Sequence, residues 1–203
     1  MGSIVIDEKY DNCRKKLREN ISGKRYLHSV GVSNTSACLA MRYGIECKRA
    51  YLAGLLHDCA KGLSGRKLLE IVSSAGLHVS ETEADNPDLL HSKAGSIIAR
   101  EEYSIDDEEM LGAIYCHTTG KPGMTDLEKI VFIADYIEPN RTGLPGLEGI
   151  RKAAFDDMDK AIVMICENTL QYLKSSPKSI DPATLETYRY YREISDSKTD
   201  HKG

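Results

Sequence analysis

Apolar side chains recur every three to four residues along most of this chain, which is the spacing that lets an α-helix bury one face. The segment 130–137, IVFIADYI, is the stretch whose composition would also suit a β-strand. A capping box of Thr125 and Glu128 precedes it and Pro139 follows it, and both features favour a helix. The sequence therefore predicts an all-α fold, a bundle of about eight helices.

Capping and helix-terminating residues divide the pattern into helices separated by turns, with polar loops expected at residues 77–90 and 139–149. The first expected helix runs from Leu27 to Met41 and ends at Gly44, and the second is a buried helix from Ala50 that stops near Gly62. Ser64 caps the third, which reaches Gly76; the fourth runs from Leu90 to Ile98; and a capping box of Asp106 and Glu109 opens the fifth, which passes Ile114. The last three run from Thr125 to Pro139, from Met158 to Leu173, and from Asp181 and Pro182 past Tyr188.

The domain organisation follows from length and composition. Of the 203 residues, 41% are hydrophobic, which is enough for one core without disulfides or a structural metal. We expect a single domain over residues 1–195 and a polar, frayed tail over residues 196–203. The formal net charge of −4 argues against a nucleic-acid partner, although it is compatible with a local basic pocket for phosphates.

Three absences predict a soluble, cytoplasmic protein. No apolar run approaches the roughly 20 residues that cross a bilayer, so no membrane association is expected. The N-terminal segment has no basic region followed by an apolar one, so it does not resemble a secretion signal. The six cysteines form no Cys-x-x-Cys pair and are expected to be reduced, mostly buried thiols.

Histidines and aspartates stand at awkward or terminal positions of the expected helices. His57 and Asp58 close the second helix, where neighbouring side chains can converge on an ion beyond the last turn. Asp135 lies among apolar residues, which is costly for a carboxylate unless it is paired or metal-bound. Each residue alone is more simply explained as a hydrogen-bonded structural group, but the joint pattern favours a metal site. Imidazole and carboxylate ligands suit iron, manganese, zinc or nickel better than calcium or magnesium.

Five short motifs occur in one order. They are RYLHSV with Arg25 and His28, LLHDCAK with His57, Asp58 and Lys61, NPDLLH ending at His91, AIYCHTTG with His117, Thr118 and Gly120, and IADYIEPNR with Asp135, Glu138, Pro139 and Arg141. Together they resemble the HD-domain superfamily of metal-dependent phosphohydrolases, and in detail its YqeK branch, the bacterial symmetrical diadenosine tetraphosphate hydrolases. The resemblance covers residues 20 to 190 approximately, nearly the whole chain.

This resemblance implies an HD-domain helical bundle with iron as the usual metal, as one or two ions. It also implies cleavage of diadenosine tetraphosphate and related dinucleoside polyphosphates into two nucleoside diphosphates, which are two ADP for the adenosine compound. By motif, the primary ion would be held by His28, His57, Asp58 and Asp135. His91 and His117 would bind either a second ion or the substrate phosphates, and the sequence leaves these two roles open.

The expected chemistry is attack of a metal-activated hydroxide on an inner phosphorus, with cations that compensate the phosphate charge. Lys61 follows His57 by four residues and would share its face in a continuing helix. Asp58, Lys61 and Arg141 are the expected catalytic residues. The expected substrate-binding residues are Arg25, Lys61, His91, His117, Thr118 and Arg141, with the backbone at Gly120 as a further donor.

Alternatives remain at the level of substrate and role. The chain could be an HD-type nucleotidase for another nucleotide, or a nucleotide-sensing module without catalysis, although none of the expected ligands is missing. Tyrosines 188, 190 and 191, with Thr169 and Tyr172, could stack on or contact a base, and ordinary packing is the alternative. A homodimer is compatible with such a domain, but the sequence offers no interface for it.

Overall fold

The computed structural model describes residues 8–176 and 179–200, and these residues confirm the all-α fold. Lys61 and Leu63 form an isolated bridge, and the described ranges contain no longer strand. Nor does any helix in them combine the length and apolar character needed to cross a membrane. The helices are α1 (Glu8–Asn20), α2 (Gly23–Tyr43), α3 (Cys47–Leu56), α4 (Gly65–Ser74), α5 (Glu81–Asp85), the 3-10 helix η1 (Pro87–Leu90), α6 (His91–Tyr103), α7 (Glu108–Cys116), α8 (Asp126–Ile137), α9 (Leu147–Ala154), α10 (Met158–Lys174) and α11 (Pro182–Asp200).

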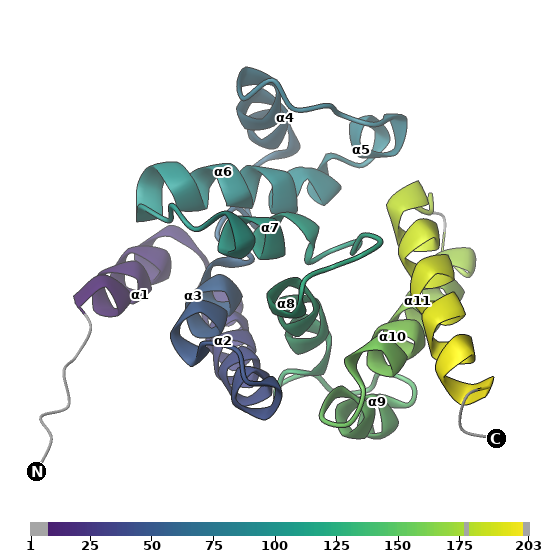
Figure 1. Ribbon diagram of the computed structural model, residues 1–203. Helices are drawn as coiled ribbons and strands as arrows, with labels where there is room; N and C mark the ends of the chain where they lie inside the picture. Colours follow the sequence, from purple (N-terminus) through teal and green to yellow (C-terminus); the bar gives the residue numbers. More distant parts are fainter. Residues whose placement is uncertain (1–7, 177–178, 201–203) are drawn as a thin grey trace, which may run out of the picture.

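Helix α8 lies in the middle of the molecule, with α2, α3 and α7 packed on it from one direction and α9 and α10 from another (Figure 1). Its residues Leu127, Ile130 and Ile133 are fully buried. The predicted capping box opens this helix, since the Glu128 amide donates to the Thr125 hydroxyl and the Thr125 amide donates to the Glu128 carboxylate. The segment 130–137 is therefore helical, as its flanking residues predict.

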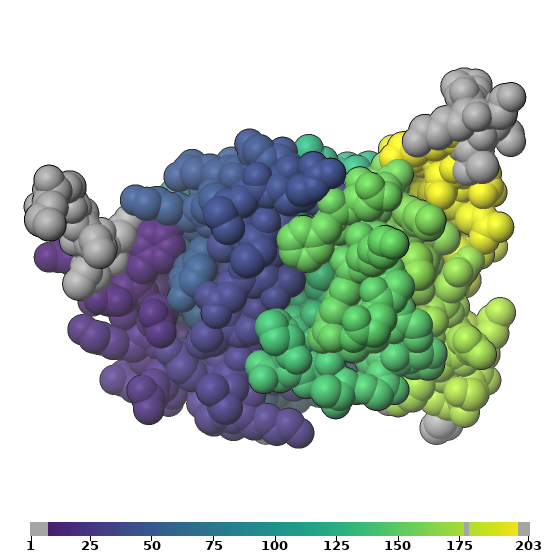
Figure 2. Space-filling model, turned by 90° about the horizontal axis from the view of Figure 1, so that it is seen from below, coloured from purple at the N-terminus to yellow at the C-terminus, as the bar shows by residue number. Residues whose placement is uncertain are grey.

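The N-terminal and C-terminal halves meet along a seam between α2 and the end of α9. Arg42 Nε donates to the Phe155 carbonyl at 2.7 Å and the Tyr43 hydroxyl donates to the Ala154 carbonyl at 2.8 Å. Figure 2 shows these two parts of the chain as adjoining halves of one face. This seam ties α2, which carries one predicted metal ligand, to the C-terminal helices.

Some helices lie where the sequence predicted a loop or no element at all. The sequence did not predict helix α1. Only Cys13 and Leu17 are buried in this helix, so its apolar stripe is too narrow to show as a helical pattern. The expected loop at residues 77–90 contains α5 and η1, and the expected loop at 139–149 already contains the start of α9. A Ser80–Glu83 capping box opens α5 and is a signal in the sequence that could have found it.

Three predicted helix boundaries are wrong. Helix α3 ends at Leu56 rather than near Gly62, and tight turns follow it. Asp107, not Asp106, caps α7, accepting hydrogen bonds from the Glu109 and Met110 amides, so no box with Glu109 forms. Helix α11 continues through Ser195 to Asp200 instead of fraying, and residues 201–203 of the expected tail lie outside the described residues.

The C-terminal helix braces the segment between α7 and α8. The Tyr191 hydroxyl, on α11, accepts a hydrogen bond of 2.8 Å from the Met124 amide, and the Tyr191 side chain is 1% exposed. On the same helix, Thr187 lies against Gly120, where an added Cβ would meet Thr187 Cγ2 at 2.6 Å. These contacts hold the segment that follows His117 and Thr118, so α11 supports the site from a distance in sequence.

We expect Tyr191→Phe to lower the free energy of unfolding by about 1–3 kcal/mol, because the buried Met124 amide would lose its acceptor. Urea unfolding followed by circular dichroism measures this change. Tyr172→Phe is the matched control, since Tyr172 is 60% exposed and its change should stay within about 0.5 kcal/mol. Equal stabilities for the two variants would show that the Tyr191 hydroxyl is not a brace.

Candidate metal centre

The six predicted metal ligands come together where several helices end. Three overlapping groups form, in each of which the possible ligand atoms lie within 4.8 Å of one another. These groups are His28, His57 and Asp58; His57, His117 and Asp135; and Asp58, His91 and His117. They draw on α2, the turn after α3, the start of α6, the end of α7 and the last turns of α8.

Three of the four histidines are oriented by the same local bond. The Nδ1 atoms of His57 and His117 lie 2.7 Å from the carbonyls of Gly54 and Ile114, and His91 Nδ1 makes the equivalent contact with the Asp88 carbonyl. A carbonyl only accepts hydrogen bonds, so each Nδ1 carries the proton. In the neutral ring, each Nε2 therefore presents a lone pair to the cluster, which is the tautomer that a metal ligand needs.

The Asp58 carboxylate joins the two halves of the cluster. Its Oδ2 lies 3.4 Å from His57 Nε2 and 3.8 Å from His28 Nε2. Its Oδ1 lies 3.3 Å from His91 Nε2 and 3.6 Å from His117 Nε2. One oxygen thus faces each pair of histidines, an arrangement that can serve one ion or bridge two.

The donor set fits a bound cation. The buried Nε2 atoms of His28 and His57 have no hydrogen-bond partner, although buried polar atoms are normally paired. His28 Nε2 nevertheless lies 3.0 Å from Asp135 Oδ1. A bare nitrogen lone pair and a carboxylate oxygen repel each other at this distance unless a proton or a metal lies between them. Four imidazoles with two carboxylates are ligands that transition metals prefer.

The electrostatics keep the aspartates in the form that binds metal. Burial alone would raise the pKa of Asp58, but His57, His117 and His91 outweigh it and hold that pKa well below its ordinary value. Burial likewise opposes the shift at Asp135, where the neighbouring imidazoles of His28 and His57 nevertheless lower the pKa. Burial lowers the pKa of His91. Ionised carboxylates and a neutral imidazole are the protonation states that metal ligation requires.

The three predicted cations and Thr118 all lie at the cluster. Arg25 Nη1 lies 2.6 Å from Asp58 Oδ2, and Arg141 Nη2 lies 3.0 Å from Asp135 Oδ1. Lys61 Nζ lies 3.1 Å from His91 Nδ1, and burial lowers the pKa of Lys61. Lys61 reaches this place from the turns after α3, not from a continuing helix as the sequence predicted. Thr118 Oγ1 lies 3.2 Å from the Nε2 atoms of both His91 and His117.

The ligands of the cluster differ in their exposure to solvent. The side chain of Asp135 is 23% exposed and that of His28 is 11% exposed, whereas that of His117 is only 2% exposed. A cavity of about 450 Å³ opens beside His28, and Arg25 and Arg141 also line it. A ligand of small-molecule size would therefore approach from the side of His28, past the two arginines.

Some expected contributions do not lie at the site. The Gly120 amide donates to the Cys116 carbonyl at 2.8 Å, so it is not available to a phosphate. Tyr191 is a buried brace rather than a platform for a base, and the Tyr188 hydroxyl is bonded to Glu167. The Glu138 carboxylate contacts His28, a role that the sequence pattern did not predict. Its place within the motif IADYIEPNR was the available signal.

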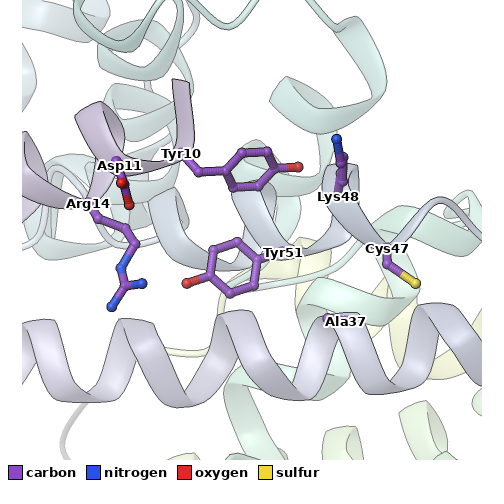
Figure 3. Close-up of a pocket in the computed structure, with 7 residues that line it drawn as sticks. All are labelled: Tyr10, Asp11, Arg14, Ala37, Cys47, Lys48 and Tyr51. Carbon is purple, nitrogen blue, oxygen red and sulfur yellow. The ribbon is translucent and has the colours of Figure 1, made fainter. Parts of the chain in front are cut away.

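A second cavity, of about 330 Å³, lies between α1, α2 and α3 (Figure 3). Tyr10 and Tyr51 form its aromatic wall, with ring centroids 5.7 Å apart, and Arg14 stands beside them. No residue that lines it belongs to the histidine–aspartate cluster. The candidate functional site is therefore the cluster with its own cavity.

Comparisons with known proteins identify the family. The sequence model of the HD domain family matches residues 25–140, which include all six predicted ligands. "Bis(5'-nucleosyl)-tetraphosphatase, symmetrical" of Bacillus subtilis (strain 168) is 36% identical over 86% of this chain and 92% of its own length. The protein of the same name from Halalkalibacterium halodurans is 39% identical over 85% of this chain and 91% of its length.

A solved structure is similar over almost the same extent. It is the crystal structure of a predicted HD superfamily hydrolase involved in NAD metabolism from Clostridium acetobutylicum. The two chains superpose with a TM-score of 0.88 at 42% sequence identity, covering 91% of this chain and 97% of that one.

We expect His57→Ala to lose most of the metal that the purified wild-type protein carries, because it removes a fully buried nitrogen donor. Elemental analysis of the two proteins, purified without chelator, measures this loss. His78→Ala is the matched control, since His78 is exposed and lies outside the cluster. Wild-type metal content in His57→Ala would rule out His57 as a ligand.

Proposed function

We propose that this chain, which belongs to the HD domain family, is a metal-dependent symmetrical bis(5'-nucleosyl)-tetraphosphatase. The substrate is diadenosine tetraphosphate and the products are two molecules of ADP. The observation that carries the proposal is the convergence of four histidines and two aspartates, with two buried Nε2 atoms that lack partners, beside a cavity bordered by arginines. The relatives that cover most of the chain supply the substrate class.

The distances support an assignment of ligand roles. His28, His57, Asp58 and Asp135 would hold the primary ion, and Asp58 with His91 and His117 could hold a second one or face a phosphate. Iron is the proposed metal, and manganese, zinc and nickel suit the same donors. When bound, the metal supplies a nucleophile from water at neutral pH and withdraws charge from the phosphoryl oxygens.

The protein's own cations would bind and orient the polyphosphate. Arg25 and Arg141 stand at the rim, where their guanidinium groups can make paired hydrogen bonds to phosphate oxygens. Lys61 lies deeper, next to His91, and would act as a point charge. Thr118 offers a hydroxyl between His91 and His117. Charges fixed in advance around the scissile phosphate stabilise the charge that develops in the transition state.

Product analysis tests the reaction. The protein is purified without chelator, its metal is quantified, and it is incubated with diadenosine tetraphosphate, and the nucleotides are separated by chromatography. We expect ADP as the sole product, because symmetrical cleavage breaks the central anhydride. ATP with AMP would reject the symmetrical reaction and keep a metal phosphohydrolase. No turnover by the metal-loaded protein would reject the proposed substrate.

We expect Arg141→Ala to lower kcat/KM for diadenosine tetraphosphate by about 10- to 100-fold, the effect of losing charge-assisted hydrogen bonds of about 1.5–3 kcal/mol. Arg141→Lys should recover only part of this loss, because it keeps the charge and removes the planar fork. Arg66→Ala, a change of an exposed arginine outside the cavity, is the control. Steady-state kinetics at measured metal content decide the matter, and wild-type kcat/KM for Arg141→Ala would remove Arg141 from substrate binding.

A further inference from the structure

Glu138 is a buried carboxylate directly behind one of the candidate metal ligands. It follows the last residue of α8 and is only 2% exposed. Its Oε1 lies 3.2 Å from His28 Nδ1, on the side of the imidazole ring that faces away from the cluster. Burying a charged carboxylate is costly unless it is hydrogen-bonded and paired, so this position calls for a specific partner.

His28 differs from the other three histidines in what holds its Nδ1. His57, His91 and His117 stand at helix ends, where the ring Nδ1 contacts the backbone carbonyl three residues earlier. His28 lies inside α2, where the carbonyls are engaged in helical hydrogen bonds. Its Nδ1 proton therefore needs an acceptor from outside the helix, and α8 supplies the Glu138 carboxylate.

The Glu138 carboxylate is itself fixed from the opposite side. Its Oε2 accepts hydrogen bonds from the Asn140 backbone amide at 2.7 Å and from Asn140 Nδ2 at 3.0 Å. Gly31, one helical turn after His28, makes room for it, because a Cβ at Gly31 would overlap with Oε2. Both oxygens thus accept hydrogen bonds, and an absent side chain on α2 allows the close approach.

We propose that Glu138 is a positioning residue that fixes the tautomer and ring orientation of His28 and strengthens its Nε2 as a metal donor. This inference rests on the metal-dependent function proposed above. A carboxylate that accepts from the far nitrogen of a histidine increases the basicity of the near nitrogen. Among the four histidines of the cluster, His28 is the one whose Nδ1 faces a carboxylate, whereas the other three face backbone carbonyls.

Glu138→Gln tests this role with little change in shape. A glutamine has one accepting oxygen and one NH2 group, so it cannot accept from both His28 and Asn140. Either the NH2 group faces the Nδ1 proton of His28 or it faces the two Asn140 donors. We expect the affinity of the apoprotein for Zn²⁺ to fall by about 10- to 100-fold. Competition with a chromophoric chelator measures this affinity without any assay of activity.

Two further variants make the result specific. Glu148→Gln removes a carboxylate that is exposed and paired only with Arg151 in the described residues, and it should bind Zn²⁺ as the wild type does. Gly31→Ala keeps Glu138 but drives its carboxylate away from Asn140 and His28. The displaced carboxylate also loses its hydrogen bonds, so the melting temperature of the apoprotein should fall. Circular dichroism shows that the variant is folded at the assay temperature, where its Zn²⁺ affinity should fall as in Glu138→Gln.

The outcomes separate this inference from the function on which it rests. Weaker Zn²⁺ binding by Glu138→Gln and Gly31→Ala, with the control unchanged, is the expected result. Wild-type affinity in both variants would overturn the role of Glu138 and leave the metal-dependent function intact. If the wild-type apoprotein bound no Zn²⁺, Mn²⁺ or Fe²⁺, the metal-dependent function itself would fail.

Discussion

The buried carboxylate of Asp58 is the group around which this structure is arranged. Its side chain is 4% exposed, and an unpaired charge in such a place would cost several kcal/mol. Five side chains from four separate parts of the chain approach its two oxygens: Arg25, His28, His57, His91 and His117. The ends of α3, α6 and α7 and the first half of α2 must therefore meet at one point. The packing of α2, α3 and α7 on α8 brings them there.

The sequence could predict the helices that begin or end at clear capping residues, and it could predict the residues that carry the chemistry. The Thr125–Glu128 box and the Asp181–Pro182 start mark helices because a few local hydrogen bonds suffice to start a helix. Helix α1 escaped prediction because tertiary packing of only two buried residues stabilises it. The end of α3 was also mispredicted. Gly62 can terminate a helix, but α3 already ends at Leu56, and the ring of His57 contacts the Gly54 carbonyl at this earlier end.

The candidate ligands were predictable as a set, whereas their support was not. The order of the five motifs suffices to group His28, His57, Asp58 and Asp135 as candidate ligands of one metal site. It does not indicate which nitrogen of each imidazole ring faces that site. That choice depends on carbonyls three residues earlier for three histidines, and on a carboxylate 110 positions away for His28. The second contact exists only because α2 packs on α8 and because position 31 is a glycine. Such a contact belongs to the fold and cannot be read from local spacing.

The charges around the cluster explain how a chain with a net charge of −4 can receive a polyanion. Asp58 and Asp135 are balanced by Arg25 and Arg141, each within 3.0 Å of its partner. A divalent cation held by the aspartates would leave the two guanidinium charges uncompensated at the rim of the cavity. The local field would then be positive although the protein as a whole is acidic, and this field acts over only about 8–10 Å at physiological salt. Metal binding and phosphate binding would thus be linked through the same two arginine–aspartate pairs.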